Sequence, residues 1–284
     1  MSGSEHGDIV IVFDLDGTVI SGRKVIPGAP EIVEKFIKKG FAIRYATNSG
    51  RTRVDITTIL EQFYGFPVDK EWVYPASYLT AKLLRKKSIR KTLAVVGEGT
   101  IHEIESKGIE VLPFHRWEKA SAVVVGLDRN FNYEKILYSM LAIRSGAEFI
   151  ATDRDAVYPY ADELYPGSNA MVASIEGTVE VAPEVAGKPS AFIIESIVEN
   201  YSYRHGREPS LIIFVGDSRR SDMGAVHAYR NKHSHGVKVI GVRVGTGVDD
   251  EGPQPDFEIE SVVQLPEFVE SLLAGELKWG GSAE

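Results

Sequence analysis

Two carboxylates follow directly after the first apolar stretch of the chain. Residues 9–13 are all apolar, and the next five read D-L-D-G-T, which contains Asp14 and Asp16. An unbroken apolar run is typical of a strand that is buried on both faces of a parallel sheet. Side chains two positions apart on an extended segment point to the same side, so both carboxylates can face the crevice where such sheets bind ligands. The alternative interpretation is a strand that ends in an ordinary Asp-Gly turn.

Other polar side chains stand where further apolar stretches end or where a helix begins. They are Thr47 and Asn48 after residues 41–46, Lys188 at the head of a predicted helix, and Asp217 with Asp222 after residues 211–215. The carboxyl ends of parallel strands lie along one edge of a sheet, and ligands bind in the crevice outside them. We therefore expect these side chains to lie near Asp14 and Asp16.

The four aspartates of this set predict a metal site. Gathered in one crevice, their carboxylates would repel one another strongly, and they need a cation and a lysine to remain ionised together. Ligation by oxygen atoms alone, with room for water, suits Mg²⁺. A phosphate group could then bridge the metal, the lysine, the asparagine and the backbone N–H groups of the first loop. This distribution of charge favours phosphoryl transfer.

Alternating strands and amphipathic helices are expected to position these residues. The first part of the chain predicts strands at 9–13 and 41–46, helices at 30–39 and 52–64, a short strand near Val73 and a further helix through Leu84. Later strands are predicted at 211–215 and 238–244, with a last helix at 266–273. An alternating βα order predicts a parallel sheet. The expected fold is α/β, with a Rossmann-like, doubly wound parallel-sheet core.

A second α/β block interrupts this pattern. Within residues 84–186, strands are predicted at 92–96, 120–125 and 148–151, and helices at 100–107 and 133–145. The block is large enough to form a small domain of its own. We therefore predict a discontinuous core domain made of residues 1–83 and 187–284, with a smaller inserted domain at residues 84–186.

Composition excludes several classes of function. The 284 residues carry a formal net charge of −8, with no block of like charge to support nucleic-acid binding. There is no cysteine, which excludes disulfides, cysteine-ligated zinc and a thiol nucleophile. No apolar run approaches the ~20 residues of a membrane span, and residues 1–8 lack the apolar core of a signal peptide. The expectation is a cytoplasmic protein with neither a nucleic-acid nor a membrane partner.

The polar sites resemble, in their order along the chain, the four motifs of the haloacid dehalogenase (HAD) superfamily. They are Asp14-Leu15-Asp16-Gly17-Thr18, then Thr47-Asn48, then Gly187-Lys188-Pro189, then Gly216-Asp217 with Asp222. The insertion between the second and third motifs is similar to that of the NagD-like, or p-nitrophenylphosphatase, branch, which carries an α/β cap domain there. Segments 96–99, 149–152 and 181–189 also resemble that branch. The resemblance covers nearly the whole chain, from about residue 8 to residue 273.

The resemblance implies a hydrolase. It would be a Mg²⁺-dependent phosphatase that hydrolyses small phosphate monoesters, with p-nitrophenyl phosphate-type activity, through an aspartyl-phosphate intermediate. Asp14 looks like the nucleophile, and Asp16 like the acid that protonates the leaving oxygen and then the base that activates water. Asp14, the main-chain carbonyl of Asp16, and Asp217 would bind Mg²⁺, with Asp222 supporting the site.

The same resemblance assigns the phosphate-binding residues, and the place of the insertion, between Asn48 and Lys188, suggests that the cap selects the substrate. Thr47 and Asn48 would hold the phosphoryl oxygens, and Lys188 would neutralise the nucleophile and the phosphate. In the cap, residues 153–168 are predicted to form a polar loop rich in tyrosine and proline, and they include the candidate specificity residues Asp153, Arg154 and Tyr158. Ordinary packing of the tyrosines is an equally good interpretation. The branch pattern there is Thr-Asn, whereas this chain has Thr152-Asp153. The resemblance also suggests a homodimer formed through the cap.

Four other functions fit parts of the pattern. A dehalogenase of the same superfamily needs the nucleophilic aspartate but neither Asp16 nor Asp217. A phosphomutase usually has its cap between the first two motifs, where this chain has only residues 19–45. A response-regulator receiver also combines an acidic cluster with Thr and Lys, but it would be much shorter and would lack the insertion. A catalytically silent phosphate-binding or phosphoacceptor module is the remaining alternative.

Overall fold

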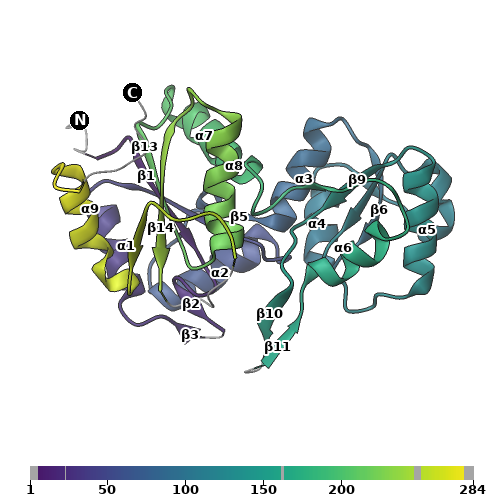
Figure 1. Ribbon diagram of the computed structural model, residues 1–284, viewed down its shortest axis with the longest axis horizontal. Helices are drawn as coiled ribbons and strands as arrows, with labels where there is room; N and C mark the ends of the chain where they lie inside the picture. The colour runs from purple at the N-terminus through teal and green to yellow at the C-terminus, as the bar shows by residue number, and fades with distance from the viewer. Residues whose placement is uncertain (1–5, 23, 161–162, 246–250, 278–284) are drawn as a thin grey trace. The chain divides into compact units, whose positions relative to one another are not determined.

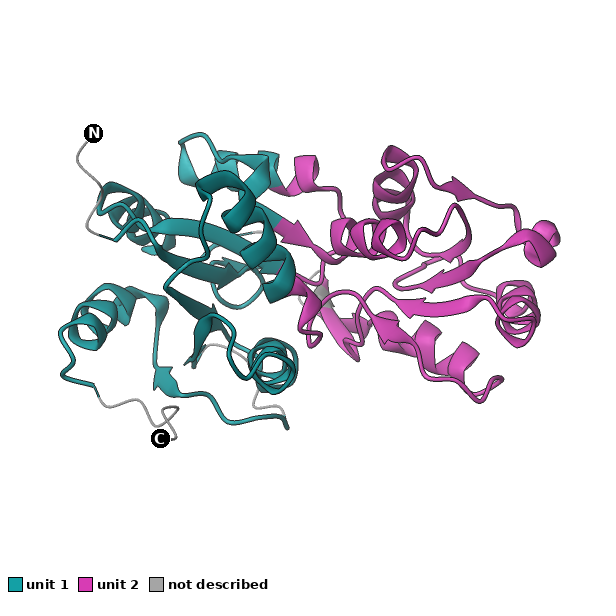
Figure 2. Cartoon of the chain, turned by 90° about the horizontal axis from the view of Figure 1, so that it is seen from above, with its two compact units in different colours: residues 1–46, 57–73, 194–284 teal, residues 47–56, 74–193 magenta. Residues whose placement is uncertain are grey.

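The computed structural model describes residues 6–22, 24–160, 163–245 and 251–277. The chain divides into two compact units, shown in different colours in Figure 2. The first unit comprises residues 1–46, 57–73 and 194–284, and the second unit comprises residues 47–56 and 74–193. Residues 74–83 and 187–193 therefore belong to the second unit, whereas the sequence placed the bounds of the inserted domain at 84 and 186.

A six-stranded sheet forms the centre of the first unit, in the order β15-β14-β13-β1-β4-β5. The strands are β1 Ile9–Asp14, β4 Ala42–Thr47, β5 Val73–Pro75, β13 Leu211–Gly216, β14 Lys238–Val244 and β15 Phe257–Ile259. β1 pairs in parallel with β13 on one side and β4 on the other, and β14 continues the parallel pairing from β13 to β15. Every residue of β1 is buried, as expected for a strand covered on both faces. The predicted α/β class with a parallel-sheet core is confirmed.

Helices cover both faces of this sheet. They are α1 Ala29–Lys38, α2 Arg53–Tyr64, α7 Phe192–His205, α8 Gly224–Lys232 and α9 Leu265–Leu273. Figure 1 shows α1 and α9 against one face of the sheet and α7 and α8 against the other. α1 begins with proline in its first turn, where a missing N–H group has no consequence, and it buries Ile32, Val33 and Phe36 along one stripe. A small antiparallel pair, β2 Ile20–Ser21 and β3 Lys24–Val25, follows the first strand.

The second unit contains a sheet of its own, in the order β12-β9-β8-β6-β7. Its strands are β6 Lys91–Val95, β7 Glu110–Val111, β8 Ala122–Val125, β9 Glu148–Ala151 and β12 Glu184–Val185, and all their pairings are parallel. The helices of this unit are α3 Ala76–Lys86, α4 Glu98–Ser106, α5 Tyr133–Arg144 and α6 Ser168–Glu176. Leu93, Val123 and Phe149 belong to its buried apolar core. All five strands lie within residues 84–186, the predicted insertion.

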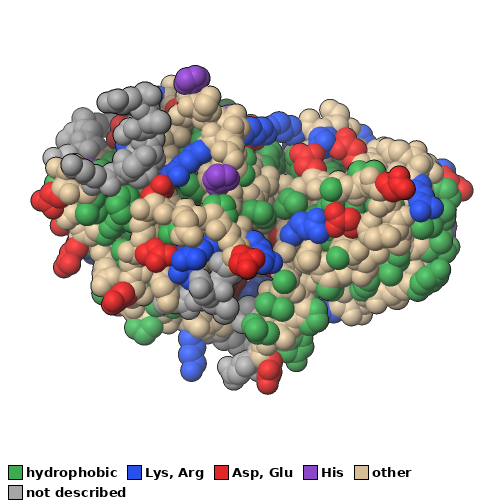
Figure 3. Space-filling model, in the orientation of Figure 1, with side chains coloured by type: hydrophobic (Ala, Val, Ile, Leu, Met, Phe, Trp, Pro, Cys, Tyr) green, Lys and Arg blue, Asp and Glu red, His purple; other side chains and the backbone are tan. Residues whose placement is uncertain are grey.

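The prediction of a loop at residues 153–168 is wrong for residues 157–160 and 163–166. β10 Val157–Tyr160 and β11 Glu163–Pro166 pair there as an antiparallel hairpin. Proline within both strands explains the prediction, because proline cannot donate to a ladder and is found mainly in edge strands and loops. Figure 3 shows hydrophobic side chains gathered over this hairpin, where Val157 and Leu164 are 50% and 62% exposed. No helix in the described part of the chain has both the length and the apolar character needed to cross a membrane.

Candidate active site

Three aspartates come together in the first unit. Asp14 ends β1, Asp217 directly follows β13, and Asp222 lies in the short turn of π-helix Arg219–Met223. Each offers a carboxylate oxygen, and these oxygens all lie within 4.8 Å of one another. Asp14 and Asp222 are buried. Three carboxylates this close, two of them shielded from water, destabilise one another unless a cation joins them.

Two glycines allow these carboxylates to pack against the main chain. A Cβ atom built on Gly17 would lie 1.9 Å from Oδ2 of Asp217, and one built on Gly216 would lie 2.2 Å from Cγ of Asp222. Gly17 also has φ of +86°, a conformation that residues with a side chain rarely adopt. The glycines of the first and fourth motifs are therefore required by the positions of the aspartates.

Asp222 has a structural partner of its own. Its Oδ2 accepts a hydrogen bond of 3.0 Å from the N–H group of Ser218. The hydroxyl of Ser218 accepts in turn from the N–H group of Ser221, also at 3.0 Å. Asp222 thus holds the turn that follows Asp217. This leaves Asp14 and Asp217 as the better candidates for direct contact with a metal ion.

The donor set fits a hard divalent cation. It consists of carboxylate oxygens alone, and such oxygens are the preferred ligands of Mg²⁺ and Ca²⁺. Asp16, the fourth aspartate of the predicted set, is exposed, and its carboxylate does not belong to the group of three. An exposed carboxylate next to a buried one fits a group that exchanges protons with water better than a metal ligand.

Thr47, Asn48 and Lys188 all belong to the second unit, and the structure joins the last two. The side-chain amide of Asn48 donates to the main-chain oxygen of Lys188 at 3.1 Å, and its Oδ1 accepts from the N–H group of Lys188 at 2.9 Å. Its other N–H donates to Oδ2 of Asp155 at 3.0 Å. Both amide N–H groups are therefore in use. The side chain of Asn48 holds the main chain around Lys188, so the expectation that this amide holds phosphoryl oxygens loses support.

The side chains of Thr47 and Lys188 are more suitable for phosphate. Thr47 is the last residue of β4, and its Oγ1 accepts from the N–H group of Ser49 at 3.1 Å, which leaves the hydroxyl proton to donate. Lys188 is only 3% exposed. A cation buried to this degree needs negative charge nearby. The buried Asp153 carboxyl, with which Lys188 interacts electrostatically, is one source of that charge, and a bound phosphate would be a further one.

The carboxylate of Asp153 is engaged within its own loop. It is buried, and its carboxylate accepts from the hydroxyl groups of Ser168 and of Thr152, the latter at 2.8 Å, and from the N–H group of Asp155 at 3.0 Å. Burial raises the pKa of the Asp153 carboxyl above its ordinary value, although these hydrogen bonds and the charge of Lys188 act in the opposite direction. Its role in the structure is to hold its own loop.

Arg154 is also engaged within the second unit. Its guanidinium makes a bidentate ion pair with Glu176, with N···O distances of 3.2 and 2.7 Å, and its Nε donates to Oδ1 of Asn169 at 3.0 Å. Pairs of this geometry are among the stronger charged interactions in proteins. The expectation that Asp153 and Arg154 contact the substrate is therefore not supported by their contacts, and both residues are better explained as parts of the loop framework.

Tyr158 has a partner that the sequence did not reveal. Its hydroxyl accepts a hydrogen bond of 2.7 Å from Nη2 of Arg129, and the guanidinium lies 4.5 Å from the centre of the Tyr160 ring. Tyr165 completes a cluster with ring-centre distances between 5.1 and 6.3 Å. Arg129 is about 30 residues earlier in the chain, so only the folded structure could connect it with the hairpin. The hairpin therefore offers flat aromatic faces with the positive charge of Arg129 beside them.

Comparison with known proteins places this geometry in a family. Residues 11–110 match the family model described as haloacid dehalogenase-like hydrolase. The chain is 32% identical over 265 residues to the 5'-nucleotidase YutF of Bacillus subtilis, with 91% of this chain and 97% of that protein covered. It is 33% identical over 235 residues to the chloroplastic phosphoglycolate phosphatase 1A of Arabidopsis thaliana, with 75% of this chain covered but only 64% of that protein's length.

Solved structures agree with these matches. The p-nitrophenyl phosphatase from Archaeoglobus fulgidus superposes with a TM-score of 0.79 and 26% identity, covering 91% of this chain and 98% of that chain. NagD from Escherichia coli K-12 superposes with a TM-score of 0.74 and 25% identity, covering 89% of this chain and 96% of that chain. The similarity therefore extends over both compact units and includes relatives whose names specify phosphate esters.

Proposed function

Because this chain belongs to the haloacid dehalogenase-like hydrolases, in their NagD-like branch, we propose that it is a Mg²⁺-dependent phosphatase of small phosphate monoesters. The observation that carries the proposal is the cluster of Asp14, Asp217 and Asp222, whose oxygens lie within 4.8 Å of one another. The relatives named above are phosphatases and a nucleotidase, which supports a phosphoric monoester hydrolase.

In this proposal Asp14 is the nucleophile. One of its carboxylate oxygens attacks phosphorus, the bond from phosphorus to the ester oxygen breaks, and an aspartyl-phosphate forms. Asp16 gives its proton to the leaving oxygen and then takes a proton from the water that attacks the aspartyl-phosphate. That second step releases inorganic phosphate, restores the Asp14 carboxylate and returns Asp16 to its protonated form. The buried end of β1 supports the assignment of Asp14, and the exposure of Asp16 supports its exchange of protons.

Asp14, Asp217 and the main-chain carbonyl of Asp16 would hold the metal ion, and Asp222 would keep the Asp217 turn in place through Ser218. When bound, Mg²⁺ would offset the negative charge of the carboxylates and of the incoming phosphate.

Thr47 and Lys188 are proposed to hold the phosphoryl oxygens. In the register of the sheet Asp14 lies opposite Ala46, and Thr47 follows Ala46 in the chain. This strand pairing supports the use of the Thr47 hydroxyl on the phosphate that Asp14 attacks. We assign Asn48 a different role from the one that the sequence suggested. It orients Lys188, whose main-chain N–H and C=O groups it binds on both sides.

The leaving group and the assembly are further parts of the proposal. Core motifs fix the chemistry, whereas the residues that contact the leaving group decide the substrate. Tyr158 remains our candidate for that contact, because its hairpin presents aromatic faces beside Arg129. A homodimer formed through the second unit also remains a prediction, which light scattering on the purified chain would check.

Hydrolysis of p-nitrophenyl phosphate by the purified chain tests the proposed function. We expect activity with Mg²⁺, loss on exhaustive chelation and recovery when Mg²⁺ is returned. Asp14→Asn should abolish turnover and phosphoenzyme formation, because an amide is a far poorer nucleophile. Asp16→Asn should lower turnover by about 10²–10⁴-fold while phosphoenzyme accumulates.

The matched control is Asp69→Asn. This change removes another carboxylate of the first unit, one that pairs with Arg204 at 3.0 Å, and it should leave turnover unchanged. Full activity after chelation, or in Asp14→Asn, would refute the mechanism. A wild-type chain that binds phosphate without hydrolysing any ester would instead be the silent phosphate-binding module.

A further inference from the structure

Arg243 is a charged residue inside an otherwise apolar part of β14. Residues 239–242 and 244 are all apolar or glycine, and all of them are buried. Arg243 itself is only 8% exposed. In the parallel register of β13 and β14 it lies opposite Gly216, the residue immediately before Asp217. A guanidinium that is withdrawn from water in this way needs specific acceptors.

The first acceptor is the main chain of Asp217. Nε of Arg243 donates to the carbonyl oxygen of Asp217 at a distance of 3.1 Å. The side chain of the same aspartate is confined by Gly17, where an added Cβ would lie 1.9 Å from its Oδ2. The main-chain carbonyl of Asp217 is therefore held by Arg243, and its carboxylate is confined by the close approach of Gly17.

The second acceptor orients the guanidinium. Nη1 of Arg243 lies 3.4 Å from Oε1 of Glu258 on β15, and Nη2 of Arg219 lies 3.1 Å from the same oxygen. The hydrogen bond from Arg219 and the charges of both arginines keep the pKa of Glu258 below its usual value. Glu258 is thus a carboxylate that holds the outer end of the guanidinium while the inner end donates to Asp217.

We infer that Arg243 is a positioning residue for Asp217, and that it keeps the turn after β13 in the conformation that binds a divalent cation. The inference rests on the proposed function, in which Asp217 is a metal ligand. Arg243 acts through Asp217 and has no proposed contact with substrate.

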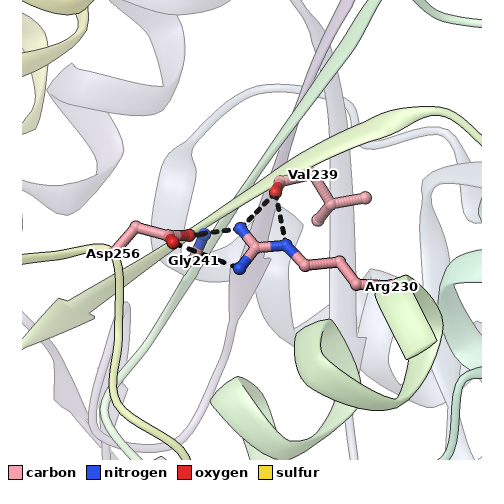
Figure 4. Close-up of polar contacts among 4 residues, drawn as sticks. All are labelled: Arg230, Val239, Gly241 and Asp256. Carbon is pink, nitrogen blue, oxygen red and sulfur yellow. Dashed lines mark hydrogen bonds and ion pairs between the residues drawn. The ribbon is translucent and has the colours of Figure 1, made fainter. Parts of the chain in front are cut away.

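Arg230 on α8 provides a matched control, because it binds the same strand, β14. Figure 4 shows its guanidinium between Val239 and Asp256. Nε donates to the carbonyl oxygen of Val239 at 3.0 Å, and Nη1 donates to Asp256 at 3.1 Å. Asp256 also accepts from the N–H group of Gly241 at 2.7 Å. Like Arg243, Arg230 therefore donates to one main-chain carbonyl and to one carboxylate, and it joins α8 to β14. Its acceptors are Val239 and Asp256, neither of which is a proposed metal ligand.

The test is a titration with Mn²⁺, in which free Mn²⁺ is measured by electron paramagnetic resonance. It uses the full-length chain as wild type, Arg243→Met and Arg230→Met. Residues that orient metal ligands typically change metal affinity by about 10–100-fold, so we expect Arg243→Met to weaken Mn²⁺ binding by at least about 10-fold. Arg230→Met should lower the melting temperature without weakening Mn²⁺ binding. In activity assays, Arg243→Met should raise the Mg²⁺ concentration needed for half-activation and leave KM for p-nitrophenyl phosphate at saturating Mg²⁺ unchanged.

A second variant keeps the test decisive if Arg243→Met does not fold. Glu258→Ala removes the exposed partner of the guanidinium and leaves the buried arginine in place. It should weaken Mn²⁺ binding in the same direction and by a smaller factor. If neither Arg243→Met nor Glu258→Ala weakens Mn²⁺ binding more than Arg230→Met does, the inference is wrong while the proposed metal site stands. If the wild-type chain binds no Mn²⁺, the metal site of the proposed function falls, and the inference falls with it.

Discussion

Replacing Gly17 by alanine tests whether the first loop fixes Asp217. The added Cβ would lie 1.9 Å from Oδ2 of Asp217, and real Cβ contacts are essentially never shorter than 3.0 Å. The carboxylate, the loop or both must therefore move by about 1.1 Å in total. Since Asp217 is a proposed metal ligand, we expect Gly17→Ala to weaken Mn²⁺ binding by at least about 10-fold, the lower end of what is lost when a ligand's support is removed.

Two terms make up the expected loss of stability. Gly17 has φ of +86°, and a residue with a side chain costs about 1–2 kcal/mol in this left-handed region. Overpacking against a fixed neighbour costs a further ~1–3 kcal/mol. Gly22→Ala separates the two terms, because Gly22 has φ of +62° but, among the described residues, no heavy atom beyond its chain neighbours lies within 4 Å of the added Cβ. Gly22→Ala should therefore lose stability only through the unfavourable backbone conformation, by about 1–2 kcal/mol, and should bind Mn²⁺ as tightly as the wild type.

Urea unfolding in chelator and Mn²⁺ titration of the two variants provide the measurements. The difference in the free energy of unfolding between Gly17→Ala and Gly22→Ala measures the cost of the clash with Asp217, which we expect to be about 1–3 kcal/mol. Added Mg²⁺ should stabilise the wild type and Gly22→Ala, because the ion binds the folded state. It should stabilise Gly17→Ala much less. If Gly17→Ala binds Mn²⁺ as tightly as Gly22→Ala, Asp217 does not depend on this contact and the account of the first loop is wrong.

Two further predictions concern the second unit. Asn48→Ala removes the three hydrogen bonds that join Asn48 to Lys188 and Asp155. Because Lys188 would then be less well oriented, we expect inorganic phosphate to become a weaker competitive inhibitor. An unchanged inhibition constant would show that Lys188 is held by other contacts. Tyr158→Phe removes the hydroxyl that accepts a hydrogen bond from Arg129. It should change the order of kcat/KM among natural phosphate esters more than it changes the hydrolysis of p-nitrophenyl phosphate. A uniform loss across all esters would instead mean damage to folding or to the core chemistry.

Short-range patterns in the sequence predicted the parts of the fold that depend on them. The apolar run that leads to Asp14 predicted a buried parallel strand, because burial on both faces requires continuous apolar character. The grouping of Asp14 with Asp217 also followed from the rule that parallel strands end at one edge of a sheet. In both cases the relevant information lies within a few residues or in a general property of sheets.

Contacts between residues far apart in the chain could not be predicted from the sequence. Asn48 and Lys188 are 140 residues apart, so nothing local indicated that the amide would bind the Lys188 main chain and be unavailable for phosphate. Asp153 was expected to contact the substrate because it lies in the predicted polar loop of the cap, but hydrogen bonds from its own loop engage its buried carboxylate. One usable signal was overlooked. Arg243 interrupts an apolar strand, and a charge in such a position points to a buried acceptor.

The hydrogen bonds of Asn48 join Lys188, the proposed phosphate-binding residue, to a loop of the second unit. One N–H group of its amide binds the Asp155 carboxylate, and the rest of the amide binds the main chain of Lys188. Asp155 lies in the segment that leads from Asp153 into the β10–β11 hairpin. A displacement of that segment therefore changes a bond to the same amide that orients Lys188. If the proposed function is correct, a substrate that fits the hairpin well would in this way favour the correct placement of the lysine, and selection of the leaving group and binding of the phosphate would be coupled through one side chain.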